Sequence, residues 1–350
     1  MIKPTNTAMN IAVYGAGSTG CYLTAELLIA KQNVTVICRE RIKQVILDNG
    51  GITISDYHGS NHCVMPSNII TDLTLLDPLT DQPPRFDLVF VTLKCHQLES
   101  NYPDLLNITH ANSSIIFMQN GLGSFDNAHQ QLPQRQIYQG ITPFNVLQLA
   151  NGRFHKGTEG QFIWPLCKHT QQISQDMTKH GLSCQLHNNM AAVINGKLLL
   201  NLNNALNVIC DLPIQAQLKQ RPLRLLLAQA MQEWLDICHK TQRPLMQFTK
   251  VAPRWLPLIL RLPNSLFNIA AKSMLAIDPH ARSSMWEDIQ AKRLTEIDYL
   301  NGAVVKLGAQ CHIATPVNAL IYQAIKQLEQ GEKININDVI SLLTTPKKKT

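Results

Sequence analysis

Three glycines near the start of the chain have the spacing of a phosphate-binding turn. Gly15, Gly17 and Gly20 follow a short apolar run at 11–14 and precede a predicted helix at 21–31. In such a turn the first glycine permits the tight bend, the second lets the backbone approach a pyrophosphate, and the third lets helix and strand pack closely. The positive end of the helix would then hold phosphate charge. The order of strand, turn and helix indicates dinucleotide binding, and a glycine turn of another α/β fold is the alternative.

The residue after the second predicted strand bears on which dinucleotide binds. A β-branched run at 33–38 ends at Arg39, where a protein that binds NAD would place an acidic residue on the ribose 2′-hydroxyl. An arginine cannot accept a hydrogen bond from that hydroxyl, but its guanidinium pairs well with a 2′-phosphate. The sequence therefore favours NADP over NAD. The alternative is a solvated charge at a strand end.

Two later predicted strands are also followed by polar residues. The strand predicted at 86–93 contains Thr92 and runs into Lys94, and the strand predicted at 114–118 is followed by Asn120. Ligands of an open parallel sheet bind beyond the carboxyl ends of its strands. We therefore expect Thr92 and Lys94 at the cofactor site, whereas Asn120 could equally be a turn residue.

A lysine and several asparagines lie within an otherwise apolar segment that is predicted to be a helix at 190–209. Lys197 and Asn201 are four residues apart, and Asn204 follows three residues later, so a helix places them on one face. Such polar groups need partners if they are buried. The alternative is a lysine that extends its ammonium group to water.

The stretch at 283–302 carries a further set of polar residues. Ser283 or Ser284 is expected to cap a helix, with Glu287 placed for a capping box. Charged and polar residues then recur at intervals of three and four, which predicts one charged helix face: Asp288, Lys292, Thr295 and Glu296. By itself this pattern is typical of a solvated helix with ion pairs.

The elements that must position these residues change in kind along the chain. Strands alternate with helices in the first half, including a small hairpin or a pair of short strands predicted at 51–64, whereas helices dominate from 190 to about 330. We expect an α/β, Rossmann-type dinucleotide-binding domain at 9–187 and an all-helical domain at 188–335. A C-terminal segment with a basic tail occupies 336–350.

One segment of the helical half, at 244–279, is rich in proline, leucine and basic residues. It could be a membrane-surface helix or an arm that binds a partner. It could also be an inserted helical pair that folds over the second domain or is buried in a dimer. We favour the inserted pair.

Composition narrows the class of protein. The chain has 350 residues and a net charge of +7, with no basic stripe of interleaved aromatic residues, so nucleic acid is a disfavoured partner. Its nine cysteines are scattered and never form a C-x-x-C pair, which argues against a disulfide framework and a zinc site. The N-terminus lacks the apolar core of a signal peptide, and no run of 18 apolar residues suggests a membrane span. We therefore expect a cytoplasmic protein without a metal.

Taken together, these stretches resemble the ketopantoate reductases (2-dehydropantoate 2-reductases). The resemblance extends from residue 10 to about residue 330, and its most specific part is the stretch at 283–302. It is carried by Gly-Ala-Gly-Ser-Thr-Gly at 15–20, Val-Thr-Leu-Lys at 91–94, Gln-Asn-Gly-Leu-Gly at 119–123, Lys-Leu-Leu-Leu-Asn at 197–201, and Ser-Ser-Met-Trp-Glu-Asp through Thr-Glu-Ile-Asp-Tyr-Leu-Asn-Gly at 283–302.

The resemblance implies NADPH-dependent reduction of 2-dehydropantoate to (R)-pantoate, on the route to pantothenate and coenzyme A. It implies an active site between a Rossmann domain and a helical domain, with Lys197 as the general acid and Glu296 as its assistant. The substrate-binding positions that it implies are Asn120, Asn201, Asn204 and Ser284. The implied cofactor-binding positions are Gly15, Ala16, Gly17, Ser18, Thr19, Gly20, Arg39, Lys94 and Asn120.

Two departures from the family pattern leave the substrate open. Ala205 stands where the family often has an asparagine, with Asn204 beside it, and Asp-Pro-His-Ala-Arg at 278–282 replaces a region with another family asparagine. A different 2-keto acid is therefore an alternative substrate, and an NADPH-binding sensor without turnover is a third reading. The intact Lys197 and Glu296 argue against a sensor. A homodimer stays open.

Overall fold

The computed structural model describes residues 9–73, 85–149, 152–272, 275, 281–334, 336 and 339. The chain divides into two compact units, one comprising Met1–Gln119 and Ser124–Met190, the other Asn120–Gly123 and Ala191–Thr350. The short segment Asn120–Gly123 thus belongs to the second unit, although the first unit flanks it in sequence. Most of the C-terminal segment predicted at 336–350, and residues 278–280, lie outside the described residues.

A six-stranded parallel sheet forms the centre of the first unit. Its strands stand in the order β5-β2-β1-β6-β7-β8, which is the doubly wound order 3-2-1-4-5-6 when the strands of this sheet alone are counted along the chain. Their bounds are β1 Asn10–Tyr14, β2 Asn33–Ile37, β5 Asn68–Ile70, β6 Phe86–Val91, β7 Thr109–Phe117 and β8 Gln136–Gln139. This topology confirms the predicted Rossmann-type fold.

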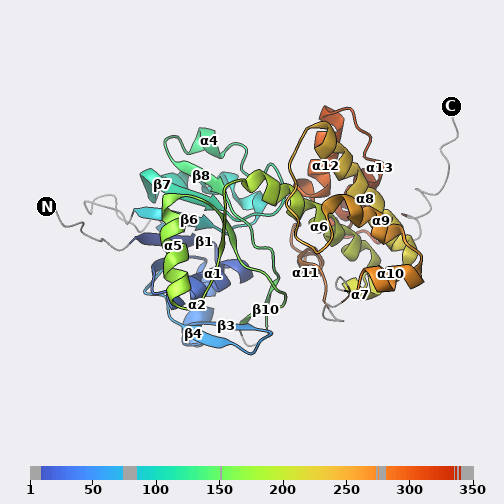
Figure 1. The fold of residues 1–350 in the computed structure, drawn as a ribbon. Helices are drawn as coiled ribbons and strands as arrows, with labels where there is room; N and C mark the ends of the chain where they lie inside the picture. The colour runs from blue at the N-terminus through green and yellow to red at the C-terminus, as the bar shows by residue number, and fades with distance from the viewer. Residues whose placement is uncertain are drawn as a thin grey trace. The chain divides into compact units, whose positions relative to one another are not determined.

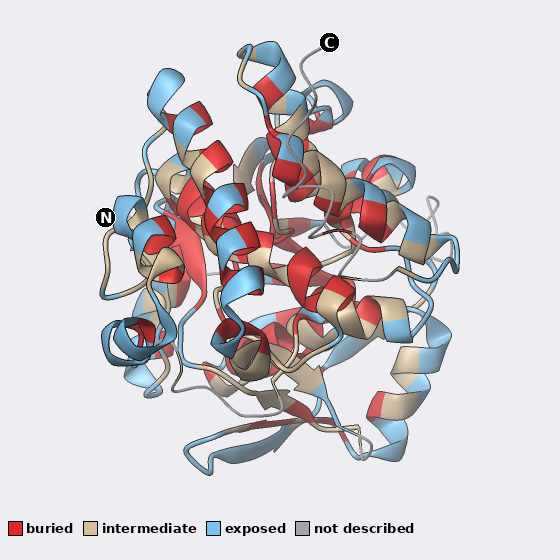
Figure 2. Ribbon diagram, turned by 90° about the vertical axis from the view of Figure 1, so that its right-hand side faces the viewer, coloured by how far each residue is buried: buried red, intermediate tan, exposed pale blue. Residues whose placement is uncertain are grey.

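Helices cover both faces of this sheet because its strands are apolar on both sides. Ile11 and Val13 of β1 pack in one core with α1 (Ser18–Ile29) and α5 (Lys168–Lys179). Their neighbours Ala12 and Tyr14 point to the opposite core, which contains residues of α3 (Tyr102–Asn107) and α4 (Ala128–Gln131). Figure 1 shows α1 and α5 on one side of the sheet. Figure 2 shows the buried residues along the strands and the inner sides of the helices.

The remaining strands of the first unit form two smaller sheets. The strands β3 (Ile52–Asp56) and β4 (Asn61–Val64) pair antiparallel, which confirms the hairpin predicted at 51–64. They continue into a sheet of order β4-β3-β10-β9, and β11 pairs with β12. The other elements of this unit are α2 Glu40–Asp48, η2 Cys95–Gln97, η3 Glu99–Asn101, β9 Val146–Gln148, β10 Phe154–Lys156, β11 Ile163–Pro165 and β12 Gln185–His187.

The second unit is built from helices around one apolar core, and its described residues contain no strand. The predicted all-helical C-terminal region is confirmed. Trp234 is fully buried in this core, and its indole Nε1 donates to the carbonyl oxygen of Asn195 at 3.1 Å. The helices are α6 Met190–Cys210, α7 Ile214–Lys219, α8 Arg221–Lys240, η4 Pro253–Trp255, α9 Leu256–Arg261, α10 Asn264–Ala270, α11 Ser284–Gln290, η5 Ile297–Tyr299, α12 Asn301–Gln310 and α13 Pro316–Glu329.

The described part of the 244–279 segment is a helical pair that packs on this unit. Leu260 and Phe267 lie fully buried in the unit's core. The buried Arg224 of α8 donates to the carbonyl oxygens of Leu260 at 3.1 Å and Leu262 at 2.9 Å, and its guanidinium stacks over the ring of Phe267. The guanidinium thus satisfies carbonyl groups that the end of α9 leaves without helical partners. The described residues of this segment thus contribute to the core of the second unit, and its being an insertion stays a prediction.

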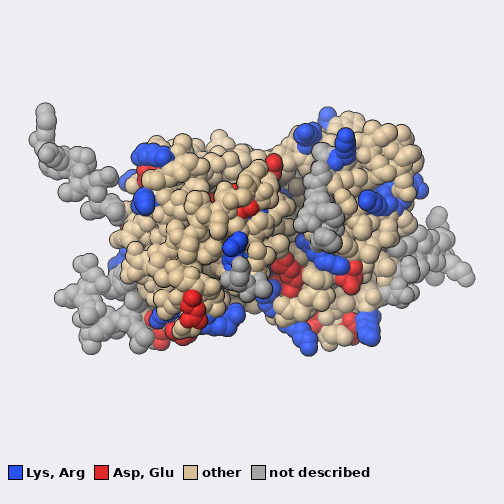
Figure 3. All heavy atoms as spheres, turned by 90° about the horizontal axis from the view of Figure 1, so that it is seen from below, with Lys and Arg blue, Asp and Glu red and all other residues tan. Residues whose placement is uncertain are grey.

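Surface charge, cysteines, helix hydropathy and clusters of possible metal ligands can be described across both units. On the face that Figure 3 shows, Lys and Arg are scattered and interspersed with Asp and Glu. All nine cysteines are free. In the part of the chain that the structure describes, no helix is long and apolar enough to cross a membrane, and no group of three His, Cys, Asp or Glu residues could hold a metal ion.

Candidate active site

The three glycines at 15, 17 and 20 form a turn that is crowded at its first and third glycine and open at its second. Gly15 has a φ of +106°, and a Cβ atom on it would lie 2.9 Å from the backbone nitrogen of Leu93. A Cβ atom on Gly20 would lie 2.0 Å from the carbonyl oxygen of Gly15. At Gly17, by contrast, a Cβ atom would meet no described atom within 4 Å. The outer two glycines therefore shape the turn, and the middle one leaves its backbone open to a ligand.

The N-terminus of α1 follows this turn directly. The helix begins at Ser18, three residues earlier than predicted, and Gly17 is its N-cap. Within the described residues, no side chain caps this end and the first turn contains no acidic residue. Its backbone N–H groups and the positive end of the helix dipole are thus available to an anion. The glycine turn and this helix end fit the pyrophosphate of a dinucleotide.

The side chain of Thr92, the residue after β6, contacts the glycine turn. Its hydroxyl donates to the carbonyl oxygen of Gly15, and a Cβ atom on Gly20 would come within 2.6 Å of that hydroxyl. Thr92 thus stabilises the shape of the glycine turn. This role was absent from the sequence-based expectation, which placed Thr92 only near the ligand.

Two basic residues follow strands on either side of β1. Arg39 is exposed, occupies the N-cap position of α2 and comes two residues after the end of β2. Lys94 is half-buried and comes three residues after the end of β6. Because β2 and β6 both pair with β1 in parallel, both basic residues emerge at the carboxyl edge of the sheet.

In the second unit, α6 carries Lys197 one turn before Asn201. Burial lowers the pKa of Lys197 from its ordinary value of 10.5 to about 8. The backbone at Met246 packs on the same helix, and its N–H donates to the carbonyl oxygen of Ala192 at 2.8 Å. A Cβ atom on Gly196 would lie 2.2 Å from the Met246 carbonyl oxygen. The glycine before Lys197 thus lets the chain at Met246 lie directly on the helix.

Three of the predicted site residues form a hydrogen-bonded chain. The Nδ2 of Asn201 donates to the Oδ1 of Asn120 at 3.3 Å, and the Nδ2 of Asn120 donates to the Oε2 of Glu296 at 3.3 Å. Since a carboxylate only accepts, the contact with Glu296 fixes which end of the Asn120 amide faces which partner. Asn120 is therefore a bridging residue between α6 and the loop before η5.

The backbone after Asn120 is held against η5. The N–H of Leu122 donates to the carbonyl oxygen of Tyr299 at 2.9 Å. Gly121 has a φ of +83°, and a Cβ atom there would lie 2.1 Å from the same oxygen. The glycine after Asn120 is thus required for this close approach, which places the Asn120 amide beside Glu296.

Ser283 caps α11, and Ser284 is an exposed residue of its first turn. The Oγ of Ser283 accepts from the N–H of Trp286 at 3.2 Å and donates to the carbonyl oxygen of Asn204 at 3.0 Å. Trp286 occupies the third helical position, so the predicted capping box with Glu287 is wrong by one residue. Ala205, which replaces a family asparagine, is fully buried in the apolar core.

The charged face predicted across 288–296 is not formed by one helix. The helix α11 ends at Gln290, and Lys292 has a left-handed φ of +52°. The N–H of Arg293 returns to the carbonyl oxygen of Asp288 at 2.8 Å, which closes the helix end. Glu296 therefore lies in a loop, and the helical periodicity that predicted its neighbours was wrong.

Two residues near Glu296 were missed by the sequence analysis. The carboxylate of Glu329 accepts from both the N–H and the Oγ of Thr295, at 2.8 and 2.7 Å. No local pattern in the sequence could indicate this contact, because it joins residues 34 positions apart. Thr295 was assigned to a solvated helix face, yet it is buried.

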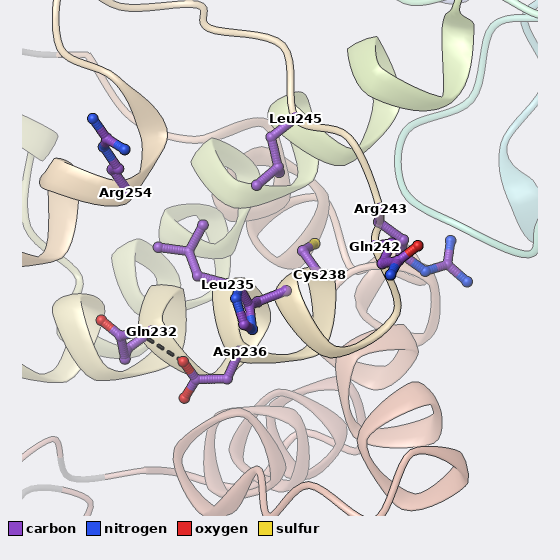
Figure 4. Close-up of a pocket in the computed structure, with 9 residues that line it drawn as sticks. Gln232, Leu235, Asp236, Cys238, Gln242, Arg243, Leu245 and Arg254 are labelled. Carbon is purple, nitrogen blue, oxygen red and sulfur yellow. Dashed lines mark hydrogen bonds between the residues drawn. The ribbon is translucent and has the colours of Figure 1, made fainter.

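A pocket of about 710 Å³ lies elsewhere on the second unit, over α8. Figure 4 shows its lining, with Gln232 donating to Asp236 at 2.8 Å. In this view the guanidinium groups of Arg243 and Arg254 point away from each other. The lining residues are Gln232, Leu235, Asp236, Cys238, His239, Gln242, Arg243, Leu245 and Arg254. None of the predicted site residues is among them.

A doubly wound nucleotide-binding unit combined with a helical unit that bears a lysine, asparagines and a glutamate is typical of the nicotinamide-dependent oxidoreductases. Comparison with protein families narrows this class. The family model Ketopantoate reductase PanE/ApbA matches residues 11–168, and the model of its C-terminal part matches residues 189–329. The chain belongs to the ketopantoate reductase family and is an oxidoreductase, and the cofactor of this family is NADPH.

Individual relatives match nearly the whole chain, but at low sequence identity. The 2-dehydropantoate 2-reductase of Vibrio cholerae is 24% identical over 339 residues, which cover 92% of this chain and 99% of the relative. The Bacillus subtilis enzyme of the same name is 23% identical over 331 residues, 92% of this chain and 98% of the relative.

Two solved structures share the fold at a TM-score of 0.75 and 20% identity, each over 92% of this chain and 99% of the other. They are a PanE/ApbA family ketopantoate reductase from Ralstonia eutropha and a D-mandelate dehydrogenase with NADH and anilino(oxo)acetate.

Proposed function

We propose that this protein reduces 2-dehydropantoate to pantoate with NADPH, with Lys197 as the general acid. The observation that carries this proposal is the hydrogen-bonded chain Asn201–Asn120–Glu296, which begins one helical turn from Lys197. A lysine at this place can supply a proton, and the carboxylate and amides beside it can orient a substrate hydroxyl or carboxylate.

The cofactor would be held by the first unit. The turn at Gly15–Gly20 and the start of α1 would bind the pyrophosphate, Arg39 the 2′-phosphate, and Lys94 a further part of the nucleotide. When bound, NADPH supplies the hydride that reduces the keto carbon. Arg39 supports NADPH over NADH because its guanidinium is a bidentate donor to phosphate and cannot accept from a hydroxyl.

The proton step falls to residues of the second unit. Reduction of a ketone leaves negative charge on its oxygen, which a nearby ammonium group stabilises and then neutralises by proton donation. With a pKa of about 8, the Lys197 ammonium is largely protonated at pH 7, yet it gives up its proton more readily than an exposed lysine. Glu296, whose carboxylate accepts from Asn120, would orient the Lys197 ammonium group relative to the substrate oxygen.

The four positions implied for substrate binding differ in their contacts. Asn120 and Asn201 are joined directly, whereas Asn204 is tied through its carbonyl oxygen to Ser283, and Ser284 is exposed beside that cap. Ala205, which stands where the family often has an asparagine, lies in the core. Asn204 is the amide next to it in the sequence. We propose Asn204 and Ser284 as substrate contacts, and we expect a cytoplasmic enzyme.

The second candidate is an NADP-dependent reductase of a different 2-keto acid. It is favoured by Ala205 and by the shared fold with a D-mandelate dehydrogenase, whose keto acid carries a bulky ring. The two candidates use the same hydride and proton chemistry and differ only in the side chain that the substrate site accepts.

A substrate panel separates the two candidates. NADPH oxidation, followed by absorbance, would be measured with 2-dehydropantoate, 2-oxoisovalerate, pyruvate and phenylglyoxylate. We expect the highest kcat/KM for 2-dehydropantoate, and a loss of kcat of about 10² or more in Lys197→Ala. Preference for phenylglyoxylate would support the second candidate, and NADPH binding without turnover of any keto acid would contradict both.

Lys306→Ala is the matched control, because Lys306 is an exposed lysine on α12 of the same unit. Its kcat should equal that of the wild type. Binding of NADPH to Lys197→Ala, measured by the cofactor's fluorescence, should stay near the wild-type value, since Lys197 is not among the proposed cofactor contacts, which lie in the first unit apart from Asn120. A similar loss of kcat in both lysine variants would remove Lys197 from the proposed role.

A further inference from the structure

Glu329, the last residue of α13, has an unusual position for a carboxylate. Its side chain is only 5% exposed, and its Oε1 accepts from both the N–H and the Oγ of Thr295, at 2.8 and 2.7 Å. Its other oxygen lies 3.0 Å from the Nζ of Lys326, one turn earlier on the same helix. Both carboxylate oxygens therefore have charge-assisted partners, and one partner is a loop distant in sequence.

Glu329 does not stabilise α13 through the helix dipole. The C-terminal end of a helix carries partial negative charge, so a carboxylate there is unfavourable and a basic residue is preferred. Lys326 offsets this cost locally. A carboxylate at this position can accept from Thr295, which a lysine or an apolar residue could not do.

The contacts of Glu329 fix the backbone immediately before Glu296. The Oγ of Thr295, while donating to Glu329, also accepts from the N–H of Ile297 at 3.2 Å. Ile297 is fully buried in the core. The residues before and after Glu296 are thus both anchored, and its half-buried side chain meets the amide of Asn120 between them.

The helix that carries Glu329 is itself held firmly. At its start, the carboxylate of Glu233 on α8 accepts from the N–H groups of Val317 and Asn318, at 2.9 and 3.0 Å. Near its end, Lys326 also binds Asp298 at 3.1 Å, two residues after Glu296. Because α13 is held in place at both ends, its residue Glu329 has a fixed position relative to the core of the second unit.

We propose that Glu329 is a positioning residue for catalysis: through Thr295 it holds the backbone on which Glu296 is placed beside Asn120. This inference rests on the proposed function, in which Glu296 assists Lys197. Glu329 itself touches neither substrate nor cofactor in this proposal.

Steady-state kinetics test the positioning role. Glu329→Ala should lower kcat by about 10- to 100-fold, the effect of a small misplacement of a catalytic group, with little change in KM for NADPH. Glu329→Gln should recover most of the rate, because an amide oxygen still accepts from Thr295. Thr295→Ser, which keeps the hydroxyl, should be near wild type, whereas Thr295→Val should resemble Glu329→Ala.

A double-mutant cycle shows whether Glu329 acts through Glu296. If it does, Glu329→Ala should cost less than about 3-fold once Glu296→Gln is present, because residues that act as a unit are not additive. Equal losses with and without Glu296→Gln would overturn the proposal and leave Glu329 a merely structural residue. The cycle uses whichever 2-keto acid the wild type reduces.

A measurement without substrate keeps this proposal separate from the proposed function. Lys292 and Arg293 are exposed at the start of the loop, so trypsin cleavage there reports how well the loop is anchored. Glu329→Ala should be cleaved at least about 5-fold faster than the wild type, because local opening exposes the loop to the protease. The control Glu332→Ala removes an exposed carboxylate three residues later and should cleave at the wild-type rate. Equal rates for both variants would contradict the anchoring, even in a protein that reduces no keto acid.

Discussion

The two units hold their candidate functional groups in different ways. In the first, the site is mostly backbone: a turn shaped by Gly15 and Gly20, an open Gly17, and the N–H groups at the start of α1. In the second, it is made of side chains from separate segments, with Asn120, Asn201 and Glu296 joined by hydrogen bonds. A backbone site is defined by local spacing, whereas a side-chain site is defined by tertiary contacts.

This difference decides how each site responds to substitution. A backbone site tolerates changes of side chain but not an added Cβ atom where the chain is crowded. A side-chain site keeps its fold when one group is replaced, but it loses the chemistry of that group. The following predictions test this distinction.

The largest effect is expected from adding one methyl group to the turn. Gly20→Ala should lower the free energy of unfolding by about 3 kcal/mol or more, because its Cβ would lie 2.0 Å from the Gly15 carbonyl oxygen and backbone must shift. Gly17→Ala should leave Tm within a degree or two, since its Cβ meets no described atom within 4 Å, yet weaken NADPH binding about 10-fold. Thermal unfolding and NADPH fluorescence measure the two effects. Equal loss of Tm in both variants would mean that the turn is not divided into shaping and binding positions.

A smaller effect is expected at Arg39, where the first unit uses a side chain. Arg39→Ala should raise the Kd for NADPH by about 10-fold, because a charge-assisted pair with the 2′-phosphate is lost. The Kd for NADH, which lacks this phosphate, should not change and serves as the internal control. If both cofactors were weakened equally, Arg39 would support the fold of the turn and would not select the cofactor.

The effect that is smallest at neutral pH is expected in the pH dependence of kcat. Reduction needs a protonated Lys197, so kcat should be constant below its lowered pKa of about 8 and fall roughly tenfold per unit of pH well above it. Lys197→Arg should lack this alkaline limb, because a guanidinium keeps its proton. A limb near 10.5 in the wild type would instead indicate an ammonium group in contact with water during catalysis.

The sequence was sufficient for the features that depend on local patterns. The spacing of Gly15, Gly17 and Gly20 between a strand and a helix predicted the turn, and the change of periodicity near residue 190 predicted the helical second unit. Lys197 and Asn201 were placed on one helix face by their spacing alone. Their chemical roles came from the family resemblance, because lysine and asparagine on a helix have no specific signature.

Features that depend on tertiary contacts were not predicted. The helix at 284 was expected to continue through Glu296, but it ends at Gln290, where Lys292 adopts a left-handed backbone. Thr295 could not be recognised as buried, because its partner Glu329 lies 34 residues later. Ser283 and Ser284 were both candidate caps in sequence, and Ser283 is distinguished in the structure by its contacts with Trp286 and with Asn204 on α6.

The assignment of Asn120–Gly123 to the second unit has a consequence for the protein's modularity. The polypeptide passes between the units three times, at 119/120, 123/124 and 190/191, so the compact units are not consecutive pieces of chain. A fragment ending at Met190 would carry Asn120 away from Asn201 and Glu296, and the complementary fragment would lack the bridge between them. A chimaera with a distant relative, joined at 190/191, would therefore take Asn120 from one parent. It would take α6 and the loop of Glu296 from the other parent. The part that must be inherited together is therefore the whole second unit, Ala191–Thr350 and Asn120–Gly123.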